Sequence, residues 1–84
     1  MEAIPKSSIN QKATLLLIDK IEKLRSLPIP ELRAGEFEQY ADSFLLQWRI
    51  RQDTPYAGTF QIQCCVTHLP SARVIAESLF YRSE

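Results

Sequence analysis

Two stretches in the middle of the chain, 44–52 and 59–67, alternate between apolar and polar residues. A period of two residues is typical of a β-strand that buries one face. The segment between the two stretches contains Asp53, Pro55 and Gly58, which favour a turn. The pattern therefore predicts a β-hairpin with one apolar face. Its apolar positions are Phe44, Leu46, Trp48 and Ile50 on the first strand and Phe60, Ile62, Cys64 and Val66 on the second.

A long amphipathic helix is predicted over residues 9–27. Ser8 and Gln11 have the spacing of a capping box at its start, and Pro28 ends it because proline lacks a backbone N–H. Residues 1–7 are expected to form a flexible lead-in to the single domain 1–84. The apolar residues that recur at helical spacing are Ala13, Leu16, Leu17, Ile21, Leu24 and Leu27.

A second helix is predicted at the end of the chain, over residues 71–81. Ser71 is a suitable N-cap, and apolar residues follow it at helical spacing. A two-stranded hairpin is only marginally stable alone, so we expect the two helices to cover its apolar face. The apolar residues of this segment are Ala72, Ile75, Ala76, Leu79 and Phe80.

The segment 36–51 fits both a helical period and a strand period. We interpret it as a strand over 44–52, preceded by a short strand at 37–40 or by a helical turn. The predicted fold class is therefore α+β: a helix, an antiparallel β-hairpin or three-stranded meander, and a C-terminal helix. The alternative is a small all-α bundle in which residues 60–80 form a helix-turn-helix-like half.

Composition places the chain among globular domains without a strong overall charge. Apolar residues make up 45% of it, and ten Lys and Arg residues balance ten Asp and Glu residues. A neutral chain has no global field to attract nucleic acid or acidic lipid. The sequence shows no signal peptide and no apolar run long enough to span a membrane, so we expect a cytoplasmic protein that is not bound to a membrane. Cys64 and Cys65 point to opposite faces of the predicted strand, so they are not expected to form a disulfide.

No set of residues in the sequence resembles a catalytic site. His68 is the one imidazole base, and nothing near Cys64 or Cys65 suggests a lowered thiol pKa. The two glycines lie far apart, which excludes a glycine-rich phosphate loop. We therefore expect no enzymatic activity, no cofactor and no metal site. A thiol-dependent activity at the two cysteines is the less favoured alternative.

The predicted order of helix, three strands and helix resembles that of the double-stranded-RNA-binding domain. In that family a lysine-rich start of the last helix neutralises phosphates. The matching turn here, 71–73, contains one basic residue, Arg73. Nucleic-acid binding, through this topology or through a helix-turn-helix, is therefore the second functional hypothesis.

The first hypothesis is a small non-catalytic module for protein–protein interaction or regulation. Its partner is expected to be another protein or a second copy of the chain. Polar residues with good binding capacity alternate on the outer face of the predicted hairpin, although a merely solvated sheet face would have the same composition. Further candidates are the extra apolar residues of the first helix and an aromatic residue in the hairpin loop. The candidate partner-binding residues are Arg49, Arg51, Gln61, Gln63, Leu15, Ile18 and Tyr56.

Overall fold

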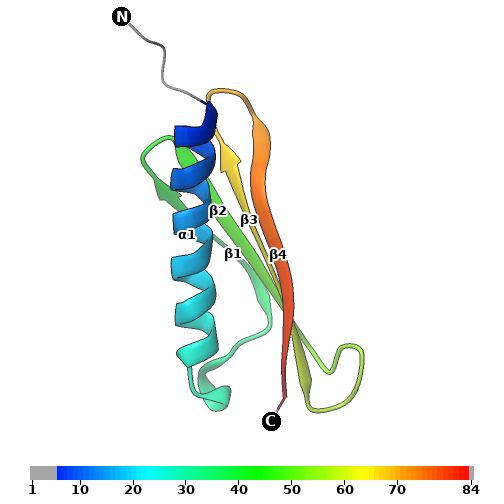
Figure 1. The fold of residues 1–84 in the computed structure, drawn as a ribbon. Helices are drawn as coiled ribbons and strands as arrows, with labels where there is room; N and C mark the ends of the chain where they lie inside the picture. Colours follow the sequence, from blue (N-terminus) through cyan, green and yellow to red (C-terminus); the bar gives the residue numbers. More distant parts are fainter. Residues whose placement is uncertain (1–5, 84) are drawn as a thin grey trace, which may run out of the picture.

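A long helix lies along one face of an antiparallel sheet (Figure 1). The computed structural model describes residues 6–83. The four strands pair in the order β1-β2-β3-β4, so each strand is joined to the next by a hairpin connection. The elements are α1 (Lys6–Ser26), the 3₁₀ helix η1 (Ile29–Glu31), β1 (Gly35–Ala41), β2 (Phe44–Gln52), β3 (Thr59–His68) and β4 (Arg73–Ser83).

The predicted N-terminal helix is confirmed, but it begins earlier than expected. It starts at Lys6, so Ser8 and Gln11 lie inside the helix and do not cap it. The helix includes residues 6 and 7 of the expected lead-in, and residues 1–5 lie outside the described part of the chain. The helix stops at Ser26, just before Pro28, as the missing N–H of proline requires.

The predicted hairpin is confirmed as β2 and β3. Ile50 lies opposite Ile62 in the antiparallel register, so the apolar positions of both strands share one face. In the loop, the carboxylate of Asp53 accepts a hydrogen bond of 2.8 Å from the N–H of Gly58. This bond is the contribution expected of an aspartate at a turn.

The segment before the hairpin forms a strand, so the alternative of a helical turn is wrong. β1 pairs with β2 along its whole length, and Phe37 lies opposite Trp48. Both side chains extend from the face of the sheet that carries the apolar residues. Their aromatic rings therefore meet at the side of the sheet on which α1 lies.

The predicted C-terminal helix is wrong, because residues 73–83 form the fourth strand. β4 pairs with β3 from Thr59↔Ser83 to His68↔Arg73, with an irregularity between Val66 and Thr67. The all-α alternative is wrong for the same reason. The topological resemblance to the double-stranded-RNA-binding domain and the helix-turn-helix interpretation both required a last helix, so neither has a structural basis.

The core lies between α1 and the middle of the sheet, and its buried strand residues belong to β2 and β3. The backbone of α1 lies closest to β3 and β4, comes close to β2 at a few positions and does not come near the backbone of β1. A helix about 10 Å wide covers roughly two strands that lie about 4.8 Å apart. The inner face of β1 and part of β2 is therefore left without a helix above it. The buried core residues are Ala13, Leu17, Leu24, Leu32, Phe44, Leu46, Ile50, Phe60, Ile62, Cys64 and Val66.

Candidate functional site

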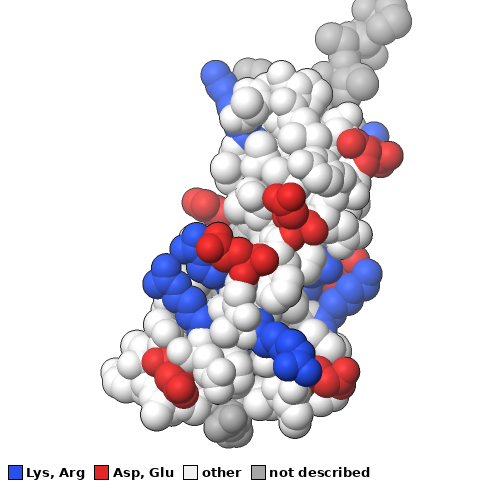
Figure 2. Space-filling model, turned by 180° about the vertical axis from the view of Figure 1, so that it is seen from behind, with Lys and Arg blue, Asp and Glu red and all other residues white. Residues whose placement is uncertain are grey.

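The structure brings four of the predicted site residues together on the outer face of the sheet. Arg49 lies opposite Gln63, and Arg51 lies opposite Gln61, so the four form two adjacent cross-strand pairs. β4 continues these rows with Leu79 and Tyr81. In Figure 2, which views the molecule from behind, charged side chains of both signs lie across the middle and lower parts of this face, and the surface above them is mostly uncharged.

Several polar groups of this outer face are already bonded to one another. Arg49 forms an ion pair of 3.0 Å with Glu36 of β1, and the amide of Gln61 donates a hydrogen bond of 3.3 Å to the hydroxyl of Tyr81. A partner that binds Arg49 must compete with Glu36 for it. The outer face is thus assembled as predicted, and its role in binding stays a prediction.

The other three predicted residues lie on separate surfaces. Leu15 and Ile18 are exposed on α1, and Tyr56 is exposed in the loop between β2 and β3. The sheet stands between the helix residues and the outer face. The structure therefore does not combine all the predicted residues into one site.

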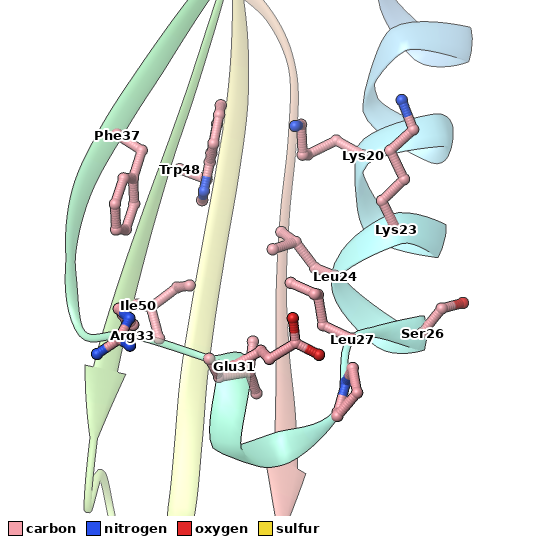
Figure 3. A pocket seen from close by; sticks show the side chains of 12 residues that line it. Lys20, Lys23, Leu24, Ser26, Leu27, Glu31, Arg33, Phe37, Trp48 and Ile50 are labelled. Atoms are coloured by element: carbon pink, nitrogen blue, oxygen red, sulfur yellow. The ribbon is translucent and has the colours of Figure 1, made fainter.

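An open apolar groove, which the sequence did not indicate, lies between the C-terminal half of α1 and the strands β1 and β2. Its volume is about 570 Å³, which falls within the range of ligand-binding clefts. Figure 3 shows helix residues facing strand residues across the opening, with the 3₁₀ turn closing one end. The lining residues are Lys20, Lys23, Leu24, Ser26, Leu27, Pro28, Glu31, Leu32, Arg33, Phe37, Trp48 and Ile50.

A stacked aromatic pair forms the strand side of the groove. The rings of Phe37 and Trp48 lie 5.7 Å apart with an angle of 19° between their planes. Phe37 is 39% exposed, although it is a large apolar residue on the inner face of the sheet. A partly exposed aromatic pair beside a concave apolar surface is the type of feature at which binding energy concentrates.

Lys20 closes the end of the groove opposite the 3₁₀ turn. Its ammonium group lies 4.0 Å from the centre of the Trp48 ring and donates a hydrogen bond of 3.4 Å to the side-chain oxygen of Gln39. Partial burial lowers the pKa of Lys20, and the positive charge of Lys23 lowers it further, whereas Asp19 acts in the opposite direction. A carboxylate placed at this end of the groove would raise the pKa of Lys20 again, because it would stabilise the charged ammonium form.

The charges around the groove are mainly positive. Lys20, Lys23 and Arg33 line it, against the single carboxylate of Glu31. Lys23 also forms an exposed ion pair of 3.0 Å with Asp19, one helical turn away. The groove therefore suits an apolar group that carries negative charge at its border.

Two aromatic residues of the groove lie in segments to which the sequence pattern assigns secondary structure. Trp48 is an apolar position of the predicted hairpin and Phe37 falls in the segment 37–40, but their contact depends on the register between β1 and β2. The gap itself depends on the position of α1 over β3 and β4. A pattern along one chain specifies neither of these three-dimensional relations.

The two thiols have the opposite character from catalytic nucleophiles. Burial raises the pKa of Cys64 to about 11, and burial together with the charge of Glu77 raises the pKa of Cys65. A thiol with a raised pKa is mostly protonated at neutral pH and therefore reacts slowly. His68 bonds to the hydroxyl of Ser71 at 2.9 Å, so it closes the turn between β3 and β4.

Within residues 6–83, no three His, Cys, Asp or Glu side chains are grouped closely enough to hold a metal ion. Over the same range, no helix combines the length and apolar character needed to cross a membrane. The chain matches no known protein family, no curated protein and no solved structure.

Proposed function

We propose that the protein is a non-catalytic protein-binding module whose groove receives an amphipathic helix of a partner protein. The observation that supports this proposal is the half-covered inner face of the sheet. The backbone of α1 lies over β3 and β4 and leaves β1 without a helix above it, so Phe37 of β1 is 39% exposed and Trp48 of β2 is only partly buried. The partner helix would complete the layer that α1 leaves unfinished.

The chemistry of the groove defines the side chains that such a helix would present. The rings of Phe37 and Trp48 lie 5.7 Å apart, and residues one turn apart on a helix are separated by about 6 Å. Two large apolar residues at i and i+4 would therefore contact Phe37 and Trp48 together. Acidic residues beside them would lie near Lys20 and Arg33, where they gain charge-assisted contacts.

The two free thiols support an inference about the cellular compartment in which the module acts. Cys64 and Cys65 are both free in the structure. Free thiols persist in reducing compartments, whereas secreted domains of this size usually form disulfides. We infer that the module acts in the cytoplasm.

The test is a display library of helical peptides selected against the immobilised protein. We expect the enriched peptides to carry two large apolar residues one turn apart and an excess of Asp and Glu. Trp48 is the single tryptophan of the chain, so binding of each synthetic peptide should shift its fluorescence emission directly. Phe37→Glu should weaken binding at least tenfold, about 1.4 kcal/mol, because it places a carboxylate in the apolar groove beside an acidic ligand.

Tyr56→Glu is the matched control, since Tyr56 is also an exposed aromatic residue but lies in the loop between β2 and β3. It should bind the peptides as the wild type does. Thermal unfolding of both variants checks that each remains folded. Peptides that bind Phe37→Glu and the wild type equally, or that leave the emission of Trp48 unchanged, would show that the groove is not the site.

A further inference from the structure

The two edges of the sheet differ in how well they are protected against pairing with another strand. β1 has seven residues and carries Glu36 and Glu38. Charged side chains and short length both discourage edge-to-edge association. β4 has eleven residues, no proline and one carboxylate, Glu77. The β4 edge is therefore the one that is open to pairing.

The exposed side chains of β4 are unusually apolar for a free edge. Leu79 is 52% exposed and Tyr81 is 50% exposed, and both lie on the outer face of the sheet. Phe80 on the inner face packs against the core but is only partly buried. A strand added beside β4 would remove apolar surface from water on both faces of the sheet.

The irregular pairing between β3 and β4 limits which part of the edge can be extended. It falls between Val66 and Thr67, opposite the beginning of β4, and bulges disturb the regular ladder. Regular pairing with β3 runs from Ala76 onward. The centre of the regular segment from Ala76 to Arg82 is Leu79.

We propose that the protein forms a homodimer in which β4 pairs antiparallel with β4 of a second copy, about a two-fold axis at Leu79. In this register Leu79 faces its own counterpart, and Glu77 lies opposite the partner's Tyr81. Ser78 lies opposite the partner's Phe80, and Ala76 lies opposite the partner's Arg82. No like charges face each other, so the segment is complementary to itself, as a two-fold interface requires.

The helix supports the same assembly. The guanidinium of Arg25 lies 5.2 Å from the ring of Phe80, which identifies the side of α1 that faces β4. Ile18 precedes Arg25 by seven residues, so it lies on nearly the same side of the helix. Ile18 is nevertheless 46% exposed, because it overlooks the free edge of the sheet. The second copy would lie beside this side chain.

The test is the mass of the wild type in solution, measured by light scattering and sedimentation from about 5 to about 200 µM. We expect about 19 kDa at the high concentrations, twice the 9.7 kDa of the chain. Leu79→Lys should restore the monomer mass, because two lysines would face each other at the axis. Tyr40→Lys is the control: Tyr40 is exposed on β1, at the protected edge, so the variant should remain dimeric.

Amide hydrogen exchange of the wild type gives a measurement that needs no variant. The outward-pointing N–H groups of 76–82 should exchange more slowly as concentration rises, whereas those of β1 should not change. A monomer mass at every concentration, or a dimer that Tyr40→Lys disrupts and Leu79→Lys does not, would overturn the proposal. The groove lies at the other end of the sheet, so a monomeric wild type that binds groove peptides would refute the dimer alone.

Discussion

Cys64 lies at the centre of the core with none of its surface exposed. Burial and the neighbouring Cys65 raise the pKa of its thiol from 9.0 to about 11, although Lys20 acts in the opposite direction. The folded protein thus holds the thiol proton more tightly than the unfolded chain does. This residue links the packing of the core to the pH dependence of stability.

We expect the free energy of unfolding to fall as the pH rises from 9 to 11. In that window the thiol of the unfolded chain loses its proton while the folded thiol keeps it, so deprotonation favours unfolding by at most about 3 kcal/mol. Urea unfolding at a series of pH values measures the slope. Lysines and tyrosines titrate in the same window. The expectation is therefore tested by the difference in slope between the wild type and Cys64→Ala. Identical slopes in the two proteins would contradict the expectation.

At the scale of elements, Arg82 joins β4 to the end of α1. Its Nη1 group donates hydrogen bonds to the carbonyls of Leu24 at 2.8 Å and Leu27 at 2.6 Å. The last carbonyls of a helix have no backbone partner within the helix, and they attract a cation because the helix dipole is negative there. A single side chain therefore caps the helix and fixes its position over the strand.

We expect Arg82→Ala to lower the free energy of unfolding by about 2 kcal/mol, because hydrogen bonds from a charged donor are lost. Arg82→Lys should recover part of the loss, since an ammonium group can reach one of the two carbonyls. Arg73→Ala, at the exposed opposite end of β4, should change stability by less than about 0.5 kcal/mol. Urea unfolding compares the three variants. Similar losses of unfolding free energy in Arg82→Ala and Arg73→Ala would argue against a specific role of Arg82 in joining β4 to α1.

The same strand, β4, shows why the sequence pattern predicted a C-terminal helix where the structure has a strand. The helix 9–27 and the hairpin follow from clear periods, whereas the spacing of Ile75, Ala76, Leu79 and Phe80 is that of a helix. At the irregular start of β4, Ile75 and Ala76 are consecutive and both are half-buried, so strict alternation is broken. The bulge therefore produced a helical pattern in a strand. The β-branched and aromatic residues of 73–81 carried the correct signal.

At the scale of the whole molecule, binding surfaces of different character lie on different sides of the sheet. The outer face carries Arg49 and Arg51, and the groove lies on the inner face between α1 and β1. The outer-face residues could be predicted because alternation alone places them. The groove required the position of a helix relative to a sheet, which is set by packing and not by local pattern.

A comparison of two variants decides between these surfaces. Used as bait in a cell extract, Arg49→Glu/Arg51→Glu should capture the same proteins as the wild type, and Phe37→Glu should lose those that bind the groove. The exposed ion pair between Arg49 and Glu36 contributes at most about 1 kcal/mol, so the double variant should stay folded. Loss of partners by the double variant and not by Phe37→Glu would instead make the outer face the binding site.

The position of the groove beside β1, at the far end of the sheet from β4, has a consequence for valency. A two-fold axis perpendicular to the sheet keeps the α1 helices of both chains on the same face of the combined sheet. The dimer would therefore present its two grooves on that one face. Counted in strand spacings, they would stand roughly 30 Å apart before the twist of the sheet is included. A target with two recognition helices on a linker of that span would be held far more tightly than one helix alone, through effective concentration.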